Sequence, residues 1–268
     1  MKRRTIAETF DALRRAGRIA LMPFIPAGYP DLETTAELIP ALEAGGASLI
    51  EIGFPFSDPI ADGPIVQEAF AHALARKVKV ADVFATVASA RNKVSIPLLG
   101  MLSFSIVYRH GVDRFVAEAK EAGLDGLILP DLPPPEAQQV CDRVRAGGLE
   151  TVLLVAPTTT PERRRQIAQL SSGFVYYLSV TGITGERDQL PPDLAANVRG
   201  LKQLTDRPVC VGFGISQPRH VKQLVGMADG AIVGSAIVRR MKAELSSPRE
   251  ALAAAIRNEV AGLSKSTG

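Results

Sequence analysis

The chain contains 268 residues, of which 46% are hydrophobic and 22% charged, and its formal net charge is +3. The small charge, the 5% content of aromatic residues and the absence of Trp argue against a nucleic-acid-binding protein. No apolar run approaches the roughly 20 residues of a membrane helix, and the N-terminus lacks the apolar core of a signal peptide, so we expect a cytoplasmic protein with no membrane contact.

The predicted elements begin with an amphipathic helix at residues 6–16, after which short strands alternate with helices. Eight apolar runs, rich in Val, Ile and Leu, are typical of parallel strands that are buried on both faces. They cover residues 20–25, 49–53, 97–103, 126–129, 151–155, 174–179, 208–212 and 230–233. Capping residues, prolines and stop glycines predict helices between them, among which are residues 32–44, 112–122, 135–146 and 161–170.

Eight strands that alternate with helices predict an α/β fold, a single (β/α)8 TIM barrel with an extra N-terminal helix that could plug its bottom. We divide the chain into an N-terminal helix (residues 1–18), a barrel (residues 19–263) and a disordered tail (residues 264–268). An open, doubly wound sheet is the alternative, but that fold usually has fewer strands at this length.

The second strand and the loop after it carry the most informative residues. Glu51 lies within an apolar strand, and Asp58 and Asp62 follow in a loop with several prolines and glycines. Burying a carboxylate costs several kcal/mol unless it is paired or used, so Glu51 is a candidate general acid/base whose pKa burial would raise. The alternative is a structural carboxylate at Glu51, with Asp62 capping the helix that begins at Pro64 and Asp58 holding its own turn.

The ends of the last two strands predict a phosphate site. Gly212 and Gly214 let backbone N–H groups approach a ligand closely, and Gly234-Ser235 opens a helix whose first N–H groups favour an anion. A phosphate between these two loops is a recurrent arrangement in barrels of this kind.

Cysteine and histidine offer no obvious site. Cys141 and Cys210 lack a CxxC spacing and are interpreted as core thiols, which is consistent with a reducing compartment. His72, His110 and His220 lie in or next to predicted helices, and no pair has the spacing of metal ligands. We expect surface or capping roles for them and no bound metal.

The residues at these strand ends resemble the α subunit of tryptophan synthase. Residues 51–64, EIGFPFSDPIADGP, match the signature segment of that family almost residue for residue. Further matches are residues 23–30, 130–133, 181–185, 212–216 and 234–238. They follow one another in order from about residue 20 to 240, so the resemblance covers nearly the whole chain.

The resemblance implies a lyase of tryptophan biosynthesis that cleaves indole-3-glycerol phosphate to indole and D-glyceraldehyde 3-phosphate in a retro-aldol step. It implies that Glu51 does the acid/base work and that Asp62 holds the indole N–H and stabilises positive charge on the ring nitrogen. Thr184 would belong to a loop that closes over the substrate, and Gly185, Gly214, Gly234 and Ser235 would hold the phosphate. The implied wall of the indole pocket comprises Phe24, Met101, Ile128, Tyr176, Phe213 and Ile232.

The resemblance also implies a partner. The family forms an α2β2 heterotetramer with a β subunit that carries pyridoxal phosphate and receives indole through a tunnel, and no cofactor is expected in this chain. The chain departs from the family at the third-strand loop, where a Tyr and an Asn followed by Pro are common and Ser103, Phe104 and Ser105 stand here. The serines are too short to repeat the same contacts, and Phe104 could restore bulk.

Three alternatives remain open at this point. The chain could be a stand-alone indole-3-glycerol-phosphate lyase, or a regulatory partner of the β subunit with weakened catalysis, which only the altered third-strand loop supports. A different phosphosugar isomerase or synthase would typically place a Lys or His at a strand end, and the sequence shows neither there.

Overall fold

A closed barrel of eight parallel strands forms the centre of the computed structural model, which describes residues 3–59, 62–179, 189–212 and 214–268. The strands follow one another in sequence order, and the barrel closes where the last strand pairs with the first, Ala20 opposite Gly230. They are β1 (Ala20–Pro26), β2 (Ile50–Gly53), β3 (Leu98–Met101), β4 (Gly126–Ile128), β5 (Glu150–Val155), β6 (Val175–Leu178), β7 (Val209–Gly212) and β8 (Gly230–Val233). The predicted barrel is confirmed, and the open sheet is excluded.

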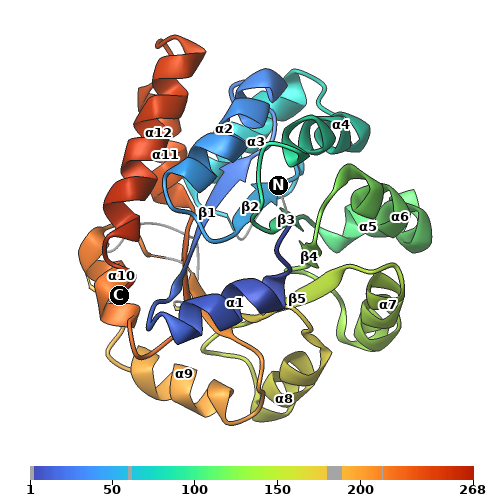
Figure 1. Ribbon diagram of the computed structural model, residues 1–268. Coiled ribbons are helices and arrows are strands. Elements are labelled where there is room, and N and C mark those ends of the chain that lie inside the picture. The colour runs from blue at the N-terminus through green and yellow to red at the C-terminus, as the bar shows by residue number, and fades with distance from the viewer. Residues whose placement is uncertain (1–2, 60–61, 180–188, 213) are drawn as a thin grey trace.

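Helices surround the barrel (Figure 1). They are α1 (Ile6–Arg15), α2 (Leu32–Ala44), α3 (Pro64–Ala75), α4 (Val80–Arg91), α5 (Phe104–His110), α6 (Val112–Ala122), α7 (Pro134–Ala146), α8 (Pro161–Leu170), α9 (Leu194–Lys202), α10 (Pro218–Leu224), α11 (Ser235–Ala243) and α12 (Arg249–Ser264). The capping chemistry explains the accuracy of the predicted bounds. Asp31, for example, accepts the Thr34 N–H at 2.7 Å and starts α2 at the expected residue.

The third strand is shorter than predicted, because the apolar run of residues 97–103 ends in a helix cap. Ser103 has extended backbone angles and its hydroxyl accepts the N–H of Ser105, which starts α5 directly after the strand. The apolar pattern alone does not reveal this change from strand to helix.

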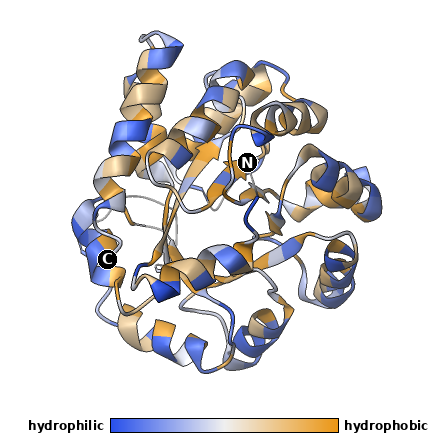
Figure 2. Ribbon diagram, viewed as in Figure 1, coloured by the Kyte–Doolittle hydropathy of each residue, from blue (hydrophilic) through white to orange (hydrophobic). Residues whose placement is uncertain are grey.

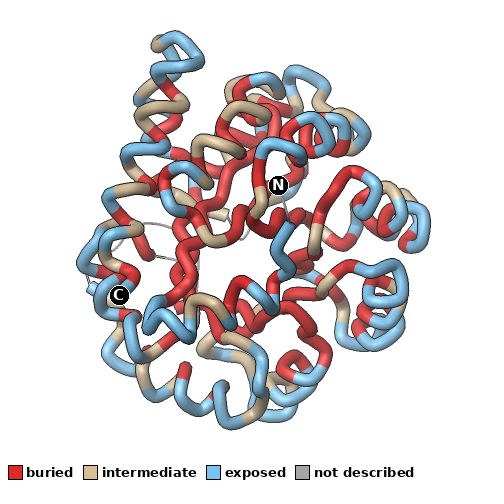
Figure 3. Tube along the Cα trace, in the orientation of Figure 1, coloured by how far each residue is buried: buried red, intermediate tan, exposed pale blue. Residues whose placement is uncertain are grey.

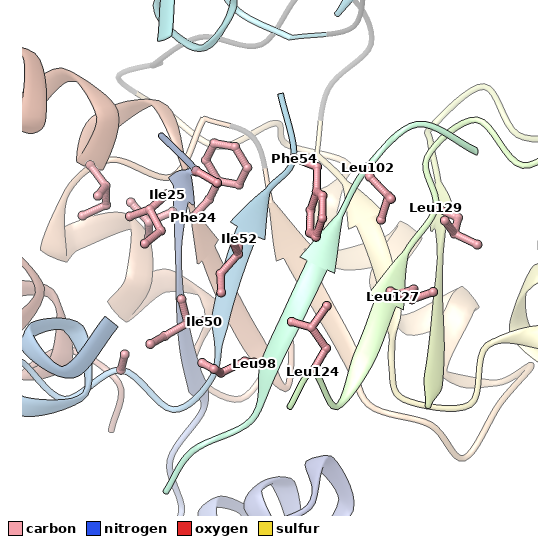
Figure 4. Packing of buried hydrophobic residues seen from close by; sticks show 14 of the residues in the cluster. Phe24, Ile25, Ile50, Ile52, Phe54, Leu98, Leu102, Leu124, Leu127 and Leu129 are labelled. Carbon is pink, nitrogen blue, oxygen red and sulfur yellow. The ribbon is translucent and has the colours of Figure 1, made fainter. Parts of the chain in front are cut away.

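The strands separate two hydrophobic layers. One layer fills the barrel interior, and the other lies between the strands and the helices. Along β2, Ile50 and Ile52 belong to the outer layer, and Figure 4 shows them on the strand with Phe24, Phe54 and Leu102 near the carboxyl ends of neighbouring strands. The buried residues therefore concentrate in the strands and on the inner sides of the helices (Figure 3), while the outer helix faces are mostly hydrophilic (Figure 2).

The N-terminal helix closes the bottom of the barrel. Ile6 and Phe10 of α1 are buried in the interior cluster, and the Phe10 ring lies 6.0 Å from that of Phe174. Figure 1 shows α1 crossing the barrel at this end. The predicted plug therefore has a direct packing basis.

The last residues differ from the disordered tail expected at residues 264–268. Thr267 is buried, its carbonyl accepts the Ile19 N–H at 2.9 Å, and its hydroxyl accepts a bond from Arg18 at 2.7 Å. The polar composition of this segment suggests disorder, but these long-range hydrogen bonds fix it beside the start of β1.

Among the helices that the structure describes, none combines the length and apolar character of a membrane span.

Candidate functional site

Glu51 faces the barrel interior near the carboxyl ends of the strands. Since Ile50 and Ile52 point to the outer layer, strand alternation turns Glu51 inward, where it pairs in register with Phe24 of β1. Only 1% of the residue is exposed, and neither carboxylate oxygen has a hydrogen-bond partner among the described residues. Burial without a partner raises the pKa of Glu51 to about 8, so the side chain is mostly protonated at neutral pH.

Asp62 lies in the loop between β2 and α3, and the structure argues against a capping role. The N-cap of α3 is Gly63, and no side chain caps that helix. Gln67 instead donates its side-chain amide to the backbone carbonyl of Asp62 at 2.8 Å. This bond holds the loop through the backbone of Asp62 and does not involve its carboxylate. Burial raises the pKa of Asp62 to about 6, so Asp62 is mostly ionised at pH 7 while Glu51 is not.

Tyr176 of β6 lies close to both carboxyl groups. Burial raises the pKa of the Tyr176 hydroxyl well above its usual value, and the charges of Glu51 and Asp62 raise it further. The residue fits against β7, because a Cβ at Gly212 would overlap the Tyr176 hydroxyl. Ile128 and Ile232 belong to the same interior cluster. The structure therefore gathers predicted residues from five strands around Glu51.

A cavity of about 330 Å³ adjoins this cluster at Met101, which packs against it, whereas Glu51, Ile128, Tyr176 and Ile232 are not in the cavity lining. Its lining is aromatic and apolar with a few acids: Phe24, Phe54, Phe56, Asp58, Pro59, Asp62, Phe70, Met101, Leu102, Ser103, Pro130 and Asp131. The predicted residues Phe24, Asp62 and Met101 thus share one pocket. All charged side chains in this lining are acidic, so the pocket suits a neutral aromatic ring and disfavours a phosphate.

The predicted phosphate residues that the structure describes follow β7 and β8. Gly214 has a φ of +80°, a conformation that glycine adopts without strain, directly after β7. Gly234 is the N-cap of α11, and Ser235 is its first residue, so the unpaired N–H groups of the first turn begin here. A Cβ built at Gly234 would lie 3.8 Å from Phe24, which places the helix start beside the aromatic pocket. Thr184, Gly185 and Phe213 lie outside the described residues.

Three features were not predicted correctly from the sequence. Ser103 donates a hydrogen bond of 2.6 Å to Asp131 and thereby joins the loops after β3 and β4. Phe104 does not restore bulk in the cavity, because its ring is buried in the outer layer. His220 is fully buried, so of the two roles expected for it, surface or capping, the surface role is wrong; its Nδ1 accepts the N–H of Ser216, just before α10, at 3.3 Å.

The comparisons with known proteins agree with one another. A family model described as "Tryptophan synthase alpha chain" matches residues 10–266. This chain belongs to the tryptophan synthase alpha chain family. It is 49% identical over 245 residues to the tryptophan synthase alpha chain of Chloroflexus aggregans, covering 91% of this chain and 92% of that one. It is 46% identical over 237 residues to the corresponding chain of Synechocystis, covering 88% and 90%.

Solved structures extend the agreement to the fold. A chain of Mycobacterium tuberculosis tryptophan synthase superimposes with a TM-score of 0.85 at 38% identity, covering 97% of this chain and 99% of that one. A mutant tryptophan synthase alpha-subunit from Pyrococcus furiosus gives 0.83 at 36% identity, covering 92% and 98%. Members of the tryptophan synthase alpha chain family are carbon–carbon lyases with a TIM-barrel fold, and this chain is one of them.

Proposed function

We propose that Glu51 and Asp62 divide the chemistry of indole-3-glycerol phosphate cleavage between them. The reaction is that of the tryptophan synthase alpha family to which the chain belongs. The proposal rests on one observation above all, the buried carboxyl group of Glu51 with both oxygens unpartnered among the described residues. Such a group is costly to keep and is protonated when the substrate arrives.

The proton balance follows from this protonation state. The Glu51 carboxyl group donates its proton to carbon 3 of the indole ring, and the bond from this carbon to the glycerol chain then breaks. Electrons of that bond return to the ring, while the hydroxyl group on the departing carbon becomes the aldehyde and gives up its proton. The Glu51 carboxylate recovers a proton from this hydroxyl, so the enzyme ends the cycle unchanged.

Asp62 has the complementary task. Protonation of carbon 3 places positive charge on the ring nitrogen, and an ionised carboxylate that accepts the indole N–H stabilises this charge. The lower pKa of Asp62 keeps it ionised where Glu51 is protonated. Two carboxyl groups whose environments separate their pKa values are a recurrent basis for such a division.

The remaining predicted residues place the two ends of the substrate. The aromatic cavity accepts the indole ring, and the N–H groups at Gly214, Gly234 and Ser235, together with Gly185, hold the phosphate, while Thr184 belongs to a loop that closes over the substrate. Within the described residues no group of His, Cys, Asp or Glu side chains is arranged to hold a metal ion. We expect the chain to act in the cytoplasm, with a β subunit that carries pyridoxal phosphate and consumes the indole.

The decisive experiment measures indole release by purified Glu51→Gln. Gln preserves the shape of the side chain but has no acidic proton to donate, so cleavage should fall by several orders of magnitude while binding of glycerol 3-phosphate persists. Near-normal turnover would contradict the assignment of Glu51. The same assay on the wild type with added β subunit tests the partner, since a true α subunit should accelerate and a stand-alone lyase should not.

A further inference from the structure

One wall of the aromatic cavity is built from an interaction between two loops. Ser103, after β3, donates its hydroxyl proton to Oδ2 of Asp131 at 2.6 Å, and the backbone N–H of Phe104 donates to Oδ1 at 2.7 Å. Both Ser103 and Asp131 line the cavity. The Asp131 carboxylate therefore holds the β3 loop by two short hydrogen bonds, one to each oxygen.

The hydrogen-bonding capacity of Ser103 is used up inside this clamp. Its proton goes to Asp131, and its oxygen accepts the Ser105 N–H at 3.2 Å and lies 2.8 Å from the Ser105 hydroxyl. An apolar ligand atom beside Ser103 would thus leave no donor unpaired. A polar wall rejects apolar groups when a buried donor would be left without an acceptor. The Ser103 hydroxyl already has its acceptor, so this part of the wall can contact an apolar substituent.

The neighbouring side chains do not fill the space in front of Ser103. Phe104 is buried in the outer layer, where its ring centroid lies 6.0 Å from that of Tyr108, and neither residue lines the cavity. Met101 and Leu102 form the adjacent cavity wall. A longer side chain at position 103 would therefore project into the cavity beside Pro130 and Asp131 of the β4 loop.

We propose that Ser103, held by Asp131, is a specificity-determining residue that lets the indole pocket accept substituents on the benzene ring of the substrate. The inference rests on the proposed function, because it takes the cavity as the indole site. Asp62 holds the ring nitrogen and Glu51 meets carbon 3, so the pyrrole part of the ring is already engaged. The benzene part is directed toward the rest of the cavity lining, in which Ser103 has the shortest side chain.

The test uses the reverse reaction, in which indole and glyceraldehyde 3-phosphate combine, with indole and indoles carrying a methyl or chloro group at each benzene-ring position. The measured quantity is kcat/KM for each substituted indole divided by kcat/KM for indole. Ser103→Leu should lower this ratio by about tenfold or more for at least one ring position, since a methylene in a fitted pocket is worth about 10- to 200-fold. Ser103→Thr keeps the hydroxyl and adds one methyl group, and should lower the same ratio by a smaller factor.

Matched controls are Ser89→Leu and Ser89→Thr, which add the same bulk at an exposed residue of α4 that lies outside the cavity lining and outside the clamp. They should leave the ratio unchanged. The inference is overturned if both Ser103 variants leave the ratio at its wild-type value, or if the wild type rejects every substituted indole. Absence of any reaction with indole itself would instead contradict the proposed function.

Discussion

Replacing the titrating carboxyl group of Glu51 with an amide should stabilise the protein at neutral pH and have almost no effect in acid. The folded protein holds the pKa of Glu51 at about 8, whereas an exposed carboxyl group in the unfolded chain titrates near 4.5. Below pH 4.5 both states are protonated, and burial of the neutral acid carries no charge penalty. As the pH rises from 4.5 to 8, the unfolded state loses its proton while the folded state keeps it, so the free energy of unfolding falls.

The size of the effect follows from these two values. At pH 7 the medium lies about 2.5 pH units above the unfolded pKa, and at about 1.4 kcal/mol per unit the penalty is about 3 kcal/mol. The Glu51→Gln variant has no titrating group at this position and therefore does not carry this penalty. Its free energy of unfolding should therefore equal that of the wild type near pH 4 and exceed it by about 3 kcal/mol at pH 7.

Urea unfolding of both proteins at several pH values between 4 and 8 measures this difference, with the denaturant slope as a check that the unfolded states are comparable. Asp31→Asn provides a control of opposite sign. Burial alone would raise the pKa of Asp31, but hydrogen bonds from Thr34 and the charge of Arg249 lower it overall, so its stabilisation is present at neutral pH and is lost in acid. A stability difference for Glu51→Gln that did not change with pH would refute the reasoning.

Three further expectations concern the rest of the site and the plug. Asp62→Asn should lower kcat by about 10²- to 10³-fold with an unchanged circular dichroism spectrum, and wild-type cleavage should decline as the pH falls through about 6; an unfolded variant would make Asp62 structural. Gly214→Val forces a β-branched residue to a φ of +80° and should weaken binding of glycerol 3-phosphate in calorimetry; unchanged affinity would remove Gly214 from the phosphate site. Phe10→Ala should cost about 3–5 kcal/mol in urea unfolding with KM unchanged; a large rise in KM would show that α1 shapes the pocket.

The barrel was predictable because its pattern is local. Each strand is a short apolar run and each helix carries its own caps, so α2 begins after Asp31 and α6 ends at Gly123, which has a φ of +95°. The closure of eight such units follows from general rules of parallel sheets. Glu51 was predictable for a related reason, since an acid within an apolar strand is conspicuous in any sequence.

The unpredicted features depend on contacts between distant segments. Ser103 and Asp131 are 28 residues apart, and no pattern in either loop indicates that a hydroxyl of one reaches a carboxylate of the other. The same holds for Thr267, whose bond to Arg18 spans 249 residues. His220 shows a further limit, because a polar residue in an amphipathic helix looks exposed until the backbone of the neighbouring loop supplies its partner.

The treatment of other buried charges makes the unpaired state of Glu51 informative. Arg91 is also buried, but its two terminal nitrogens have acceptors, the carbonyl of Ile96 at 3.0 Å and the carboxylate of Asp125 at 3.5 Å, and only its Nε has no hydrogen-bond partner among the described residues. The chain thus pairs a buried charge where the charge serves structure. Glu51 receives no such partner among the described residues, and its register partner Phe24 lines a cavity that can hold an aromatic ring. Holding Glu51 protonated in the folded state lowers the free energy of unfolding by about 3 kcal/mol at pH 7, and Glu51→Gln would remove this cost. The chain keeps the acid because only a carboxylic acid can donate the proton that the reaction needs.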